Sequence, residues 1–141
     1  VSSNTSWWGV NTRGNGEPRP THGKYIFGVW DESNDLSASI QQTLSNLPAG
    51  RYELQVDMHA SNTPTAKRVG NQRLFAGKAV AYFRDQVKNA GTNDNYPMQT
   101  IKLQFVQNEA KSPVTIGVAT DGAPSATWFK IDNFRLFLLE K

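Results

Sequence analysis

The sequence predicts an all-β fold, an antiparallel β-sandwich of jelly-roll type with about eight strands and little or no helix. The first observation is that apolar and polar residues alternate with a period of two in several segments, whereas helical periodicity is nearly absent. The second is that turn residues separate these segments at short intervals, as they do in sandwiches. At a length of 141 residues, we expect residues 1–141 to form a single domain.

The predicted strands follow one another along the whole chain after a polar N-terminal segment. The clearest strand has one apolar and one polar face, with Tyr52, Leu54, Val56 and Met58 alternating with Glu53, Gln55, Asp57 and His59. The same pattern, or a shorter version of it, predicts strands at 25–30, 39–44, 72–76, 78–83, 101–106 and 114–118. The segments 1–23 and 84–97 are rich in Gly, Asn and Pro, so we expect long loops there.

The closing strand is predicted to contain a bulge. Its apolar residues change parity in the middle of the run, from odd positions to even ones: Phe129 and Ile131, then Phe134, Leu136 and Leu138. A flat strand would direct half of them towards water. A bulge near Asp132 and Asn133 would bring all five inside, and it would curve the sheet.

Composition excludes several classes of function. The chain has no cysteine, which removes disulfides, thiolate catalysis and Cys-ligated zinc. No apolar run reaches the length of a membrane-spanning helix. The formal charge of +3 comes from scattered residues, and the densest basic group, Lys67, Arg68 and Arg73, is too thin for a nucleic-acid surface. We therefore expect no membrane span and no nucleic-acid partner.

Catalytic motifs are also missing. Only two histidines occur, His22 and His59, and no G-x-S-x-G motif accompanies them. Asp31, Glu32 and Asp35 could form a carboxylate pair, but a polar turn explains the DESND stretch equally well. The sequence thus predicts that the chain is not an enzyme and names no catalytic residue, with a small hydrolase or lyase as the remaining enzymatic alternative.

Aromatic residues in polar surroundings are the main candidates for ligand binding. They are Trp7 and Trp8 in the segment SNTSWWGVNTRGNG, Trp30 at the end of a strand and Trp128 at the start of the closing strand. A tryptophan face can stack on a sugar ring, and the nearby Arg13 could donate hydrogen bonds to hydroxyl groups. The alternative is that these tryptophans pack against the ends of the sandwich.

A second candidate group is polar. Asp57 and His59 lie two residues apart on one strand face, and Arg68 and Arg73 could approach them if the following strand pairs closely. Such a row suits recognition of a polyol, although it also describes an ordinary solvated face. Asp132 could accept backbone hydrogen bonds or hold a structural calcium ion, for which one carboxylate is a poor site. We expect no other metal and no cofactor.

Five segments together resemble a known family. GKYIFGVW, SIQQTLSNLPAGRYELQV, TIKLQFV, PVTIGV and WFKIDNFRL are similar, in this order, to the galactose-binding-like β-jelly-roll domains that occur as carbohydrate-binding modules. The likeness covers roughly residues 24–139. In that group an acidic residue of the first strand and an aspartate of the last resemble a calcium site; residues 1–6 contain no acidic residue, so only Asp132 matches, with a structural role.

The resemblance implies a function and a setting. It implies a non-catalytic module that binds a neutral or plant-type polysaccharide, with β-galactan or a related hemicellulose as a candidate, and that targets an attached polysaccharide-degrading enzyme to its substrate. The expected setting is secreted, periplasmic or on the bacterial cell surface, with the module as a monomer. The alternative is a structural or protein-interaction sandwich that accompanies a secreted glycoside hydrolase and binds no sugar.

Overall fold

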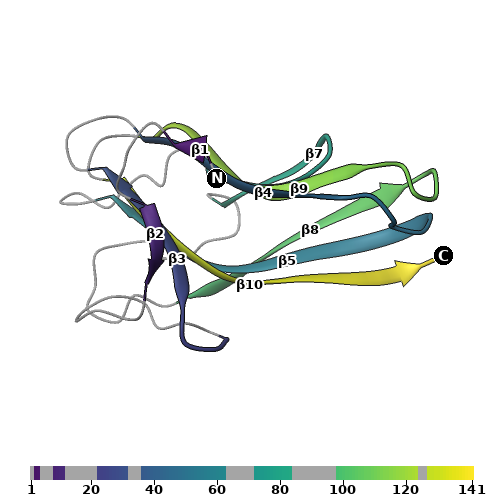
Figure 1. Ribbon diagram of the computed structural model, residues 1–141, viewed down its shortest axis with the longest axis horizontal. Helices are drawn as coiled ribbons and strands as arrows, with labels where there is room; N and C mark the ends of the chain where they lie inside the picture. The colour runs from purple at the N-terminus through teal and green to yellow at the C-terminus, as the bar shows by residue number, and fades with distance from the viewer. Residues whose placement is uncertain are drawn as a thin grey trace.

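The computed structural model describes residues 2–3, 8–11, 22–31, 36–62, 72–83, 98–123 and 127–141. One sheet, here called the β9 sheet, contains in spatial order β1 (Ser2–Ser3), β4 (Leu36–Leu44), β9 (Val114–Ala123), β6 (Arg73–Ala76) and β7 (Ala79–Tyr82). The other, the β10 sheet, contains β2 (Trp8–Asn11), β3 (Ile26–Asp31), β10 (Thr127–Glu140), β5 (Gly50–Asn62) and β8 (Gln99–Gln107). Figure 1 shows the two layers, with β4 and β9 above β5 and β10. The predicted antiparallel sandwich is confirmed.

The eight predicted strands correspond to β3–β10, and the structure adds two short strands, β1 and β2. The expectation that residues 1–23 form only a loop is therefore wrong for these two strands. Both are sheet edges, because β1 pairs only with β4 and β2 only with β3 among the described residues. Pairing with an existing strand supplies their hydrogen bonds, so neither needs an alternating pattern of its own. The predicted loop at 84–97 lies outside the described residues.

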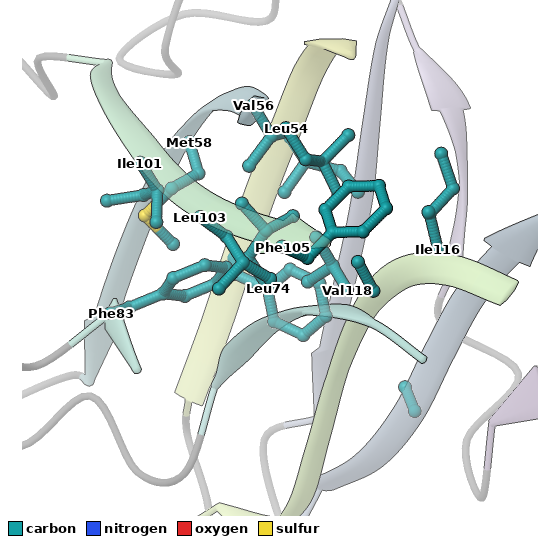
Figure 2. Close-up of a cluster of buried hydrophobic side chains, with 14 of the residues drawn as sticks. Leu54, Val56, Met58, Leu74, Phe83, Ile101, Leu103, Phe105, Ile116 and Val118 are labelled. Carbon is teal, nitrogen blue, oxygen red and sulfur yellow. The ribbon is translucent and has the colours of Figure 1, made fainter. Parts of the chain in front are cut away.

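The core lies between the two sheets and contains the apolar faces that the alternation predicted. Leu54, Val56 and Met58 of β5 are fully buried, and they meet apolar residues of β6, β8 and β9. Figure 2 shows Leu74, Phe83 and Leu103 among the side chains gathered there. Full burial of such an aliphatic or aromatic side chain stabilises the fold by about 1.5–3 kcal/mol. The core thus fixes which face of every central strand points outwards.

The predicted bulge in the closing strand is confirmed, with a correction to its consequence. The register between β10 and β5 shifts between Asp132 and Arg135, and Asn133 adopts a positive φ of 56°. Phe129 and Ile131 lie in the core as expected, and Leu136 is partly buried against it. Phe134 and Leu138, however, are 39% and 44% exposed. Phe134 lies within the bulge, and Leu138 lies near the end of β10, where it pairs with the core residue Tyr52.

No helix among the described residues is long and apolar enough to cross a lipid bilayer.

Candidate functional site

The pairing of β3, β10 and β5 places two of the predicted tryptophans at facing positions. Trp128 of β10 pairs with Trp30 of β3 on one side and with Ser61 of β5 on the other. Residues that face each other across antiparallel strands share a sheet face, and their Cα atoms are about 4.5–5.5 Å apart. We call Trp30, Trp128 and Ser61 the tryptophan row. It lies on the outer face of the β10 sheet, because the neighbouring residues Phe129 and Val29 face the core.

The next row on the same outer face is formed by Gly28, Lys130 and His59. Lys130 is only 8% exposed and His59 is fully buried. The lysine side chain lies over the glycine, since a Cβ atom at position 28 would be 2.6–2.9 Å from Lys130 Cδ, Cε and Nζ. Any side chain at position 28 would therefore displace the lysine. The absence of a side chain at Gly28 thus leaves the space that the Lys130 side chain occupies.

Asp57, in the third row, is held by other residues of the scaffold. Its carboxylate accepts two hydrogen bonds from Arg135, from Nη1 at 2.9 Å and Nη2 at 2.8 Å, and one from the Thr100 hydroxyl at 2.8 Å. Asn133 Nδ2 lies 3.5 Å from the same carboxylate. These hydrogen bonds to Asp57 raise the pKa of the Arg135 guanidinium above its ordinary value, against the opposing effect of its partial burial.

The structure corrects the exposure that the sequence suggested for Asp57 and His59. Both were expected on a polar face open to water or to a ligand, yet Asp57 is 6% exposed and His59 is 0% exposed. The alternation of β5 identified the correct face, but a position on the outer face of a sheet can be covered by other parts of the chain. Whether either residue contacts a ligand stays a prediction. The described contacts of Asp57 are those of a scaffold residue.

Asp132 takes the first of the two roles expected for it. Its Oδ1 accepts the backbone N–H of Asn133 at 2.8 Å, and its Oδ2 accepts the backbone N–H of His22 at 2.9 Å. The carboxylate thus fastens the bulge to the segment that leads into β3. Within the described ranges, no group of three or more His, Asp or Glu side chains could hold a metal ion.

Of the remaining predicted residues, the structure places Trp8 and Arg73 away from the tryptophan row. Trp8 pairs with Val29, so its position is on the core side of the β10 sheet, opposite to that of Trp30. Trp7, Arg13 and Arg68 lie outside the described residues. Arg73 is in β6 of the other sheet, where its Nη1 forms an ion pair with Asp121 Oδ2 at 2.6 Å. The proximity of Arg73 to Asp57 and His59 that the sequence suggested is wrong, because β6 pairs with β9 and not with β5.

Lys130 is the residue of this face that the sequence did not single out. It lies on β10, between Gly28 of β3 and His59 of β5. A signal was present in the sequence, because Lys130 and Trp128 have the same parity in the closing strand and thus share a face. The tryptophan row and the row of Lys130 next to it thus combine two aromatic positions with a buried cation and an imidazole on one sheet face.

Comparisons with known proteins identify solved structures that share this architecture. No family model matches the chain, and no curated protein matches its sequence. Among solved structures, a family 61 carbohydrate-binding module, TmCBM61, in complex with β-1,4-galactotriose is similar with a TM-score of 0.66 and 18% identity, over 97% of this chain and 86% of that one. A family 16 carbohydrate-binding module, module 2, is similar with a TM-score of 0.56 and 15% identity, over 83% of this chain and 79% of that one.

A third similar structure is a cyclase from Fischerella sp. TAU in complex with 4-(1H-indol-3-yl)butan-2-one, at a TM-score of 0.46 and 16% identity, over 83% of this chain and 65% of that one. The two carbohydrate-binding modules have TM-scores above 0.5 over most of both chains. At this level of identity the agreement concerns the fold. The chain therefore has the β-sandwich fold of carbohydrate-binding modules.

Proposed function

We propose that the protein is a non-catalytic carbohydrate-binding module for a neutral or plant-type polysaccharide, with β-galactan or a related hemicellulose as the first candidate. The observation that carries the proposal is the facing position of Trp30 and Trp128 on the outer side of the β10 sheet. Two neighbouring indole rings there would offer a flat apolar surface to the C–H faces of a sugar chain. The fold shared with two carbohydrate-binding modules supports the same function.

The expected affinity is modest. Burying about 100 Å² of apolar surface against an indole stabilises a complex by about 2–3 kcal/mol. One or two such stacked rings and a few hydrogen bonds, reduced by the cost of ordering the ligand, correspond to a dissociation constant of about 10 µM to 1 mM. Binding of this strength suits a module that holds an attached, secreted enzyme near a polysaccharide with many equivalent sites. Attachment to such an enzyme and secretion by a bacterium are part of this proposal.

Affinity gel electrophoresis against a panel of soluble polysaccharides tests the function. We expect β-galactan or another neutral member of the panel to retard the protein, and the variants Trp30→Ala and Trp128→Ala to lose most of the retardation. Phe137→Ala is the matched control, because Phe137 is an exposed aromatic residue of the same strand, about 30 Å from Trp128. Normal mobility of the unmodified protein in every gel would rule the function out.

A second candidate function is a structural domain that packs against a neighbouring protein domain and binds no sugar. The specific observation in its favour is the exposed apolar end of β10, where Phe137, Leu138 and Leu139 are all at least 39% exposed. Tryptophan fluorescence separates the two candidates. If an oligosaccharide shifts the emission and acrylamide quenches it, the carbohydrate-binding function is supported. If the emission is blue-shifted and neither reagent changes it, the structural function is supported.

A further inference from the structure

An open trough lies on the outer face of the β9 sheet, on the opposite side of the sandwich from the tryptophan row. Its volume is about 610 Å³. The residues that give it chemical character come from β4, β6, β9 and the turn after β6: Ser39, Gln41, Arg73, Phe75, Lys78 and Asp121. No feature singled out in the sequence predicted it, although Arg73 was a candidate ligand residue.

The smallest side chains under the trough belong to the central strand β9. Two successive rows cross the sheet from β4 through β9 and β6 to β7: Gln41, Gly117, Phe75 and Val80, then Ser39, Ala119, Arg73 and Tyr82. In each row the β9 residue is the smallest, and Ala119 lines the trough itself. At position 117 a Cβ atom would collide with the backbone oxygen of Ile40. The close approach of β4 to β9 thus leaves no side chain between Gln41 and Phe75.

The trough runs along the strands. Its lining extends from Ser37 to Gln41 on β4, and from Arg73 in β6 to Gly77 just after it. Four residue steps on each side correspond to about 13 Å. The ion pair between Arg73 and Asp121 lies in this lining. The trough is thus elongated along the strands and open to solvent, a shape that suits an extended chain.

The lining offers groups that suit a polyhydroxylated ligand. The half-buried ring of Phe75 offers an apolar face, and the Gln41 amide and Ser39 hydroxyl offer both donors and acceptors. Asp121 compensates the charge of Arg73, and the exposed Lys78 adds one further cationic hydrogen-bond donor. An apolar wall facing a polar one is the arrangement that a sugar ring, with its C–H face and its hydroxyl rim, can satisfy.

We propose that this trough is a second glycan-binding site of the protein, occupied by an extended neutral oligosaccharide. The choice of a glycan rests on the proposed function, whereas the existence of the trough does not. Because the two sites lie on opposite faces of the sandwich, one molecule would contact two polysaccharide chains at once. Such a bivalent module raises its effective affinity for a dense substrate without any new contact.

Titration of the ¹⁵N-labelled protein with β-1,4-galactotriose, and with the oligosaccharide of any other polysaccharide that retards the protein, tests this inference. We expect the backbone signals of Ala119 and Thr120, which line the trough, to shift with ligand concentration. Phe75→Ala should weaken this response about tenfold while leaving the response near Trp128 unchanged. Gln41→Ala is a second variant that removes only an exposed side chain, so it tests the trough even if Phe75→Ala disturbs the sheet.

The titration tests both the second site and the assignment of glycan binding to the tryptophan row. Shifts on both faces, lost separately in Trp30→Ala and Phe75→Ala, support the second site. Shifts confined to the tryptophan row overturn the second site and leave the proposed function standing. Shifts confined to the trough support the site and overturn the assignment of binding to the tryptophan row. No shift with any of these oligosaccharides, together with no retardation in any gel, overturns both proposals.

Discussion

The ion pair between Asp57 and Arg135 allows a sharp test of whether Asp57 supports the scaffold or binds a ligand. The pair is bidentate and partly buried, with side-chain exposures of 9% for Asp57 and 26% for Arg135. The perturbation is a double-mutant cycle that consists of Asp57→Ala, Arg135→Ala and the combined variant. The scaffold interpretation predicts a loss of stability with unchanged glycan binding by the molecules that remain folded.

The magnitudes follow from the two exposures. Removing one partner of a fully buried pair costs about 3–5 kcal/mol, and the partial exposure of Arg135 reduces the expected cost here to about 2–3 kcal/mol. Arg135→Ala should cost more than Asp57→Ala, because it leaves a nearly buried carboxylate with the Thr100 hydroxyl, whereas Asp57→Ala leaves a guanidinium that reaches water. We expect a coupling energy of about 1.5–3 kcal/mol between the two side chains.

Urea unfolding of the four proteins measures the cycle. The matched control is the Arg51–Glu140 pair, which has a similar distance of 2.7 Å but side-chain exposures of 40% and 67%. Its coupling energy should stay below about 1 kcal/mol, since exposed pairs contribute little. A coupling energy for Asp57 and Arg135 no larger than that of the control would refute the reasoning. Loss of glycan binding in a stable Asp57→Ala variant would instead assign Asp57 to a ligand.

Three further predictions concern other parts of the fold. Gly117→Ala should lower the free energy of unfolding by about 1–3 kcal/mol in urea, because the added methyl group meets the backbone of Ile40; an unchanged midpoint would contradict the packing described. Gln72→Met should raise stability by about 1–2 kcal/mol, since Gln72 is 1% exposed and neither polar atom of its amide has a hydrogen-bond partner among the described residues; a loss would reveal a partner such as a buried water. The pKa of Glu53 is lowered mainly by a hydrogen bond from Gln55 and, to a smaller extent, by one from Gln104. The stability that Glu53 contributes is therefore present above the unfolded pKa of 4.5, and it is lost as the pH falls through the lower folded pKa. Acid unfolding curves of Glu53→Gln should show less pH dependence below 4.5, and curves parallel to those of the unmodified protein would disprove this.

The sequence predicted the parts of the fold that local pattern determines. Strict alternation identified both faces of β5, because a buried face and a polar face differ in composition at every second residue. The parity change after Ile131 located the bulge for the same reason. The short strand β2 carried no such signal, since its four residues are too few to show an alternating pattern and it is defined by its pairing with β3.

The candidate site was predicted less completely, because it depends on which strands become neighbours. Trp30 and Trp128 were identified from their polar surroundings, but their facing positions follow only from the pairing of β3 with β10. Arg73 was placed in the wrong sheet, since a single sequence does not show that β6 crosses to pair with β9. Burial of His59 was missed because alternation identifies a face without showing what covers it.

The most direct test of the proposed function is a crystal structure of the protein with a bound oligosaccharide, for which β-1,4-galactotriose is the first choice. We predict electron density for sugar rings stacked on Trp30 and Trp128, with hydrogen bonds to the hydroxyl groups from neighbouring side chains on the outer face of the β10 sheet. Tryptophan side chains packed beneath other parts of the chain, with no sugar bound over them, would contradict the account.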